Sequence, residues 1–156
     1  MAAEQAAEVI GIEAAVVPTK TVPEGLAAIL AFNPEVEVSV NATAMIEAAS
    51  FVKTGQVTHA VRDTSIDGVD IEKDDFMGIS GGKIVISTPS LDEVMKALLA
   101  SLINEDDEIV TILYGEDVSE EEASVMVSYI EDHFDHIEVE LYNGKQPLYP
   151  YIISVE

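Results

Sequence analysis

The chain has 156 residues and a formal net charge of -23, because 30 acidic residues outweigh 7 basic ones. Such a charge repels phosphate backbones, so we expect no nucleic-acid partner, and no apolar run approaches the roughly 20 residues that cross a bilayer, so we expect no membrane insertion. The lack of cysteine excludes disulfides, thiolate metal sites and cysteine nucleophiles, and is compatible with a cytoplasmic protein.

The N-terminal third of the chain is typical of helices around one strand. Gly11 follows an Ala-rich run, as expected just past the end of a helix. Thr21 and Glu24 have the spacing of a capping box at the start of a second helix. Apolar residues then recur at helical spacing up to Val52. We expect helices at 2–10, 22–32 and 40–52, and a buried strand at 14–18.

The rest of the chain alternates between strands and helices. The capping-box spacing recurs at Ser90 with Glu93 and at Ser119 with Glu122. A strand, a helix and a strand joined by short loops around the second of these boxes predict a right-handed parallel crossover. We expect helices at 91–102 and 120–134, and strands at 57–64, 76–79, 83–87, 108–114 and 137–141, followed by a last strand from Tyr151.

Together these elements predict a mixed α/β fold. We expect a largely parallel sheet with flanking helices and an antiparallel C-terminal strand. The chain forms one α/β unit in this interpretation, with sub-lobes at about 1–66 and 67–156.

The C-terminal segment combines a polar turn, at 144–150, with an apolar strand. Free termini usually fray, so this pattern predicts a last strand locked into the sheet and a loop presented at its end. Tyr149 and Tyr151 flank Pro150 on one side of an extended segment, which favours an aromatic recognition surface, with packing over the sheet edge as the alternative. Gln146 in this loop and Tyr114 at a strand end are further binding candidates.

Arg62 is the only arginine, and it follows a strand, where α/β proteins commonly place ligand contacts. Its guanidinium suits a phosphate or a partner's carboxylate, while pairing with a local acid is an equal alternative. Asp63 and Thr64 follow it and join the candidates. Neither a Walker A loop nor a dinucleotide-binding glycine motif is present, and the sequence predicts no catalytic residue and no metal ligand.

Four segments carry a resemblance to a known family. They are Val57–Thr64, Asp67–Ile71, Leu113–Asp117 and the C-terminal segment from Gly144. They resemble the C-terminal domain of bacterial DhaL-domain proteins, the fatty acid kinase catalytic subunits related to dihydroxyacetone kinase. The resemblance covers nearly the whole chain and implies a fold like that of the DegV and dihydroxyacetone-kinase group. Met1–Ala7 resembles the middle of a family element, so we expect a fragment whose kinase domain lies upstream.

The resemblance also implies a function. The family binds magnesium-ATP through an aspartate-rich motif of its N-terminal domain, which nothing here matches, so we expect no cofactor and no enzyme activity in this chain. The family's C-terminal domain is associated with docking, which implies an acyl-binding DegV-like protein and the chain's own upstream kinase domain as partners. The alternative is a small-molecule domain that binds an acyl chain or a phosphorylated metabolite between lobes, with Arg62 or Lys20 as anion anchor.

Overall fold

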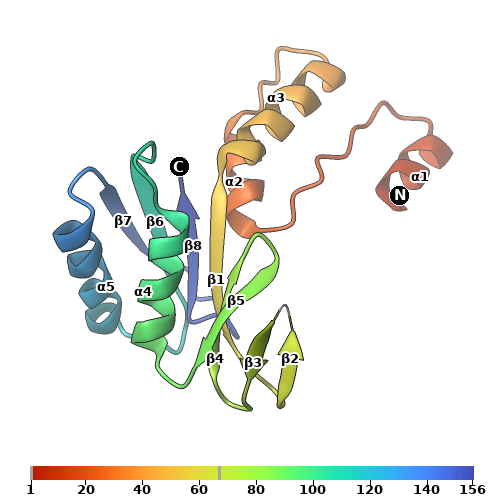
Figure 1. Cartoon of the computed structure of the whole chain (residues 1–156). Helices are drawn as coiled ribbons and strands as arrows, with labels where there is room; N and C mark the ends of the chain where they lie inside the picture. The colour runs from red at the N-terminus through yellow and green to blue at the C-terminus, as the bar shows by residue number, and fades with distance from the viewer. Residues whose placement is uncertain (1, 67) are drawn as a thin grey trace. The chain divides into compact units, whose positions relative to one another are not determined.

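A computed structural model describes residues 2–66 and 68–156 (Figure 1). Asp67 lies outside the described residues, and with it part of the turn expected at Asp67 and Gly68. The chain divides into two compact units, unit 1 up to Val52 and unit 2 from Lys53. The division lies before the position near residue 66 that we expected, because the strand that starts at Lys53 pairs with strands from the second half of the chain.

Unit 1 is helical, with α1 at Ala2–Ile10, α2 at Val22–Leu30 and α3 at Val38–Phe51. Thr21 caps α2 as predicted, since its hydroxyl accepts a hydrogen bond from the Glu24 backbone at 3.3 Å. The strand expected at 14–18 is wrong: residues 12–20 adopt neither helix nor strand. A strand is stabilised by a hydrogen-bonded neighbour, and the other described elements of unit 1 are helices.

A buried asparagine closes the turn between α2 and α3. The Asn41 side chain accepts from the Asn33 backbone at 2.8 Å and donates to the carbonyls of Asn33 at 2.7 Å and Val36 at 3.2 Å. Every polar atom of this amide therefore has a partner, as burial requires. By contrast, several large apolar side chains of α2 and α3 stay exposed, among them Leu26, Ile29, Leu30, Val40 and Phe51.

Unit 2 is built on a six-stranded sheet with the order β5-β4-β1-β8-β6-β7. Within this sheet only β6 and β7 run parallel, so the expectation of a largely parallel sheet is wrong. The mixed α/β fold, the antiparallel C-terminal strand and the crossover from β6 through α5 to β7 are confirmed. The strands are β1 Lys53–His59, β4 Phe76–Ser80, β5 Lys83–Thr88, β6 Ile109–Tyr114, β7 Glu138–Asn143 and β8 Tyr151–Val155, and a separate ribbon pairs β2 Thr64–Ile66 with β3 Val69–Ile71.

The core of unit 2 lies between the sheet and two helices, α4 at Leu91–Leu102 and α5 at Glu120–His133 (Figure 1). Ser90 and Ser119 cap these helices as predicted. All residues of β8 are buried between β1 and β6, which confirms that the last strand is locked into the sheet. At Gly55 a β-carbon would lie 2.6 Å from Leu102, so this glycine lets α4 approach β1 closely.

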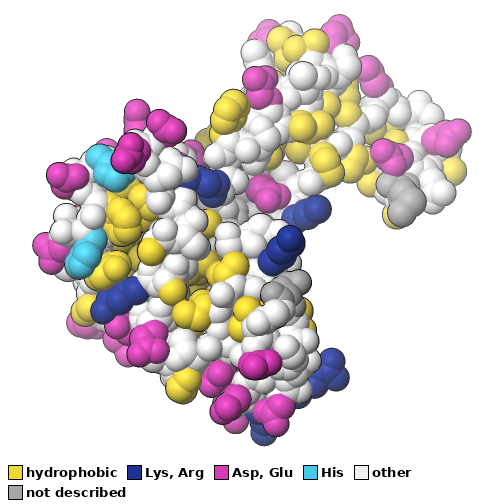
Figure 2. Space-filling view, viewed as in Figure 1, with side chains coloured by type: hydrophobic (Ala, Val, Ile, Leu, Met, Phe, Trp, Pro, Cys, Tyr) yellow, Lys and Arg dark blue, Asp and Glu magenta, His cyan; other side chains and the backbone are white. Residues whose placement is uncertain are grey.

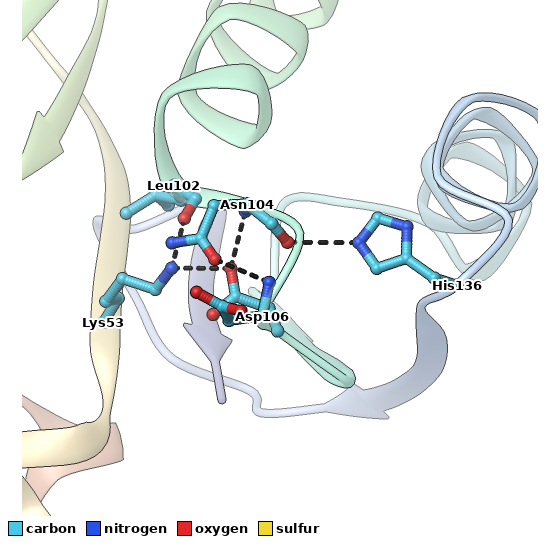
Figure 3. Close-up of polar contacts among 6 residues, drawn as sticks. Lys53, Leu102, Asn104, Asp106 and His136 are labelled. Carbon is cyan, nitrogen blue, oxygen red and sulfur yellow. Dashed lines mark hydrogen bonds and ion pairs between the residues drawn. The ribbon is translucent and has the colours of Figure 1, made fainter.

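A polar network fastens the end of the sheet where β1 begins (Figure 3). Lys53 Nζ donates to the carbonyl of Leu102 at 2.7 Å and pairs with Asp107 at 2.6 Å. The Asp107 carboxylate also accepts from the Asn104 backbone at 2.6 Å, and the His136 ring lies 3.1 Å from the Asn104 carbonyl. These contacts join the start of β1, the end of α4 and the turn before β7, so this end is occupied by structural bonds.

Candidate functional site

The opposite end of the sheet gathers most of the predicted candidates. Tyr151 at the start of β8 pairs with Val57 near the end of β1 and with Tyr114 at the end of β6, while Tyr114 also lies opposite Asn143 at the end of β7. We call this end the loop edge; it comprises the ends of β1, β6 and β7, loop 144–150 and the first turns of α4 and α5 (Figure 1). Strand ends of α/β sheets are common places for binding sites.

Loop 144–150 is fixed to the sheet by hydrogen bonds from several directions. Gln146 Nε2 donates to the carbonyls of Leu113 at 2.9 Å and Tyr149 at 3.2 Å, which gives this predicted candidate a positioning role. The Gly115 backbone donates to the Pro150 carbonyl at 2.9 Å. The loop is therefore held in one shape before any partner arrives.

Leu148 is the unusual residue of this loop. Its φ is 68°, in the left-handed region that is unfavourable for a bulky side chain, and its side chain is 74% exposed. Strained backbone of this kind clusters at ligand and partner sites, and an exposed leucine offers an apolar contact. Sequence reasoning missed Leu148, because a leucine gives no signal of positive φ.

Tyr149 and Tyr151 do not form the aromatic surface that we expected. Tyr149 is half-buried, while Tyr151 is 2% exposed and belongs to the hydrophobic core. The expectation is wrong because Tyr151 opens the central strand β8, whose residues are covered on both faces. Tyr114, its neighbour on β6, is likewise a core residue. Packing is thus the structural position of both Tyr114 and Tyr151.

Arg62 and Asp63 lie on the surface in the bend after β1, which ends at His59 and not at Thr64 as expected. Within residues 2–66 and 68–156, Arg62 forms no ion pair or hydrogen bond, so of its two alternatives the structure favours a guanidinium available to a ligand. Asp63 accepts from the Lys73 backbone at 2.7 Å. Thr64 opens the β2 and β3 ribbon.

Lys20 belongs to unit 1, apart from the candidates of unit 2. It lines a pocket of about 320 Å³ inside that unit, together with Val17, Glu24 and Ile46. The Lys20 backbone donates to the Glu24 carboxylate at 2.6 Å. This pocket offers a cation beside apolar walls.

A second pocket, of about 240 Å³, lies at the loop edge between α4 and α5. Burial, with a contribution from the charge of Glu122, raises the pKa of Tyr151 to about 12, so its hydroxyl stays protonated. Hydrogen bonds from Ser119 lower the pKa of Glu122, so its carboxylate stays ionised. The pocket is lined by Leu91, Asp92, Met95, Glu122, Val125, Met126 and Tyr151.

Residues 1–156 match the model of the FakA-like C-terminal family, which describes the C-terminal part of a fatty acid kinase protein, over the whole length of the chain. The chain belongs to this family. It is 53% identical to protein YloV of Bacillus subtilis and 42% identical to an uncharacterized protein of Staphylococcus epidermidis. Each match covers all of this chain and 28% of the relative, so the chain spans little more than a quarter of the length of these proteins.

Two solved DegV family structures share the fold of the chain. One, from Corynebacterium glutamicum, has a TM-score of 0.60 at 14% identity, over 99% of this chain and 67% of that one. The other, from Ruminococcus gnavus and related to a structure with vaccenic acid, has a TM-score of 0.51 at 15% identity, over 86% of this chain and 55% of that one. The DegV-like fold expected from the sequence is confirmed. Among the described helices, none has the length and apolar character to cross a membrane.

Proposed function

We propose that this chain is a non-catalytic docking domain of a DhaL-type fatty acid kinase-like protein in the cytoplasm, and that it binds an acyl-carrying DegV-like protein. In this proposal magnesium-ATP binds to a separate kinase domain of the parent protein, which is also a partner. Membership of the FakA-like C-terminal family and the DegV-like fold support a role linked to fatty acids. The observation that carries docking is the exposed Leu148 on a fixed loop.

The physical argument for docking is preorganisation. A loop that is already held by Gln146 and Thr58 loses little conformational entropy on binding, so more of the contact energy appears as affinity. Leu148 supplies the apolar contact, and Arg62 a cation with no ion-pair partner in the described chain. Apolar anchors surrounded by polar groups are typical of protein interfaces.

The test is a binding titration with a purified DegV-family protein loaded with vaccenic acid. We expect wild-type binding that weakens by about 1–2 kcal/mol in Leu148→Ala, since an apolar anchor is lost. Val85→Ala is the matched control, because Val85 is an exposed apolar residue in the middle of β5, away from loop 144–150. An absence of wild-type binding at roughly 100 μM would refute the docking function.

The second candidate is a small-molecule domain, favoured by the Lys20 pocket of unit 1. A fatty acid carboxylate or a phosphate would face the Lys20 ammonium, with the acyl part against Val17 and Ile46. Titration of the chain with vaccenic acid, without any protein partner, separates the candidates. Binding that is lost in Lys20→Met favours the small-molecule function, and no heat of binding removes it.

A further inference from the structure

The pocket between α4 and α5 has a polar floor that none of the described groups satisfies. Tyr151 is 2% exposed, and no group within residues 2–66 and 68–156 hydrogen-bonds its hydroxyl. Because no enclosed side-chain polar atom of the described chain lacks a partner, the hydroxyl opens into the pocket. A phenol this deep gains free energy from a ligand that hydrogen-bonds it.

The walls of this pocket are apolar and its rim is acidic. Leu91 and Met95 on α4 face Val125 and Met126 on α5, and the carboxylates belong to Asp92 and Glu122. Figure 2 shows acidic side chains over the lower end of unit 2, where these helices begin. An anionic ligand, such as a free fatty acid carboxylate, is therefore repelled from the rim.

The two carboxylates are not equally available. Asp92 pairs with Lys96 at 2.7 Å, and that ammonium also lies 5.2 Å from the centre of the Tyr129 ring. Glu122 accepts from the backbone and the hydroxyl of Ser119 at 2.9 and 2.7 Å, both through Oε2. Neither bond uses Oε1 of Glu122, so this oxygen and the Tyr151 hydroxyl are the acceptors that a ligand can reach.

We propose that this pocket receives a cationic side chain with an aliphatic stem, an arginine or a lysine, from the docked partner protein. The inference rests on the docking function proposed above. The stem packs against Met126 and Val125, as long cationic side chains do on apolar surfaces, while the cation pairs with Glu122 and donates to the Tyr151 oxygen. A neutral apolar side chain would leave the Tyr151 hydroxyl without a partner.

The first test needs no partner protein. N-acetyl-arginine methylamide, the lysine equivalent and the neutral norleucine equivalent are titrated into the chain at millimolar concentration, and the methyl signals of Leu91, Val125 and Met126 are followed by NMR. We expect saturable shifts with one or both cations and weaker ones with norleucine. Equal shifts with all three probes, or no shifts, would overturn the proposal. Shifts with vaccenic acid alone would make the pocket an acyl site instead.

The second test uses two variants with the same change in net charge. Glu122→Gln removes the pocket carboxylate but keeps a residue that completes the capping box, so α5 is expected to stay capped. Glu121→Gln removes a neighbouring exposed carboxylate that does not line the pocket. We expect Glu122→Gln to weaken the binding of the cationic probe and of the DegV-family partner roughly tenfold, and Glu121→Gln to change both by less than about twofold.

The two proposals fail in different ways. If the wild-type chain binds the partner and both variants bind it equally well, docking stands and the pocket proposal is wrong. If the chain does not bind the partner, docking fails, and the pocket proposal is judged by the probes alone. A thermal melt of each variant shows whether the folded fraction is unchanged.

Discussion

Thr58 donates its hydroxyl to the backbone carbonyl of Leu148 at 2.9 Å, a bond between residues 90 positions apart. Thr58 lies near the end of β1, and Leu148 is the exposed residue whose φ is 68°. The bond fixes the carbonyl of the strained residue to the sheet. The shape of loop 144–150 is therefore set by unit 2 as a whole, and the local preference of a leucine is overridden.

Leu148→Gly separates the strain of this residue from its contact surface. Glycine adopts positive φ at little cost, while a left-handed L-residue loses about 1–2 kcal/mol, so we expect the free energy of unfolding to stay the same or rise. Binding to the DegV-family partner should fall, because the apolar side chain is gone. Urea unfolding and a binding titration on the same preparation check both. A less stable variant that binds like wild type would contradict the role of Leu148 as an anchor.

Gly115→Ala should displace the loop. A β-carbon at this position would lie 2.5 Å from the Tyr149 carbonyl oxygen and 2.7 Å from that of Gln146, and both are backbone atoms. We expect a loss of about 1–3 kcal/mol in the free energy of unfolding, as for other overpacked sites. Gly25→Ala in α2 is the control, since its nearest neighbour, Thr19 Oγ1, would be 3.8 Å away; it should stabilise by up to about 1 kcal/mol. Equal effects of the two changes would refute the close contact at Gly115.

Sequence reasoning worked where the deciding interactions are local. Thr21, Ser90 and Ser119 each accept from a backbone group only three residues away, so the starts of α2, α4 and α5 follow from the sequence. The strand expected at 14–18 depended on a neighbour that a local pattern cannot supply. The direction of the strands was misjudged because the insertion of β8 between β1 and β6 joins segments that lie far apart in the sequence.

The candidate site divides in the same way. Proline and tyrosine near the C-terminus marked loop 144–150 correctly as a special segment at the end of a strand. Alternation along an extended segment places Tyr149 and Tyr151 on one side, but it does not say that β8 is covered on both faces, so Tyr151 was misplaced on the surface. The free hydroxyl of Tyr151 and the φ of Leu148 both depend on tertiary packing, and no sequence motif announces either.

Asp107 is expected to carry more stability than a surface ion pair. Its carboxylate is 8% exposed and binds both the Lys53 ammonium and the Asn104 backbone (Figure 3), so Asp107→Ala leaves two donors without their acceptor. We expect a loss of about 2–4 kcal/mol in the free energy of unfolding by urea titration. Lys96→Ala, which breaks the more exposed pair with Asp92, should cost no more than about 1 kcal/mol. Similar losses in the two variants would show that the Asp107 network adds nothing beyond an exposed pair.

Tyr151 should make the stability of unit 2 sensitive to alkaline pH. Burial, together with the charge of Glu122, raises its pKa from 10.0 to about 12. Between these values the unfolded chain releases the phenol proton while the folded chain keeps it, so the unfolded state binds fewer protons and the free energy of unfolding falls as pH rises. The contribution is fully present below about pH 10 and is lost progressively towards about pH 12.

Tyr151→Phe removes this contribution and keeps the ring in the core. We expect the stability difference between wild type and Tyr151→Phe to shift by about 1–2 kcal/mol in favour of the variant between about pH 9 and about pH 11.5, measured by urea unfolding. Tyr149→Phe is the matched control, because it makes the same chemical change at a half-buried residue of loop 144–150, and its curve should follow wild type. If wild type and Tyr151→Phe lose stability in parallel over this range, the Tyr151 hydroxyl is not shielded in the folded chain, and the buried polar floor of the α4 and α5 pocket would have to be abandoned.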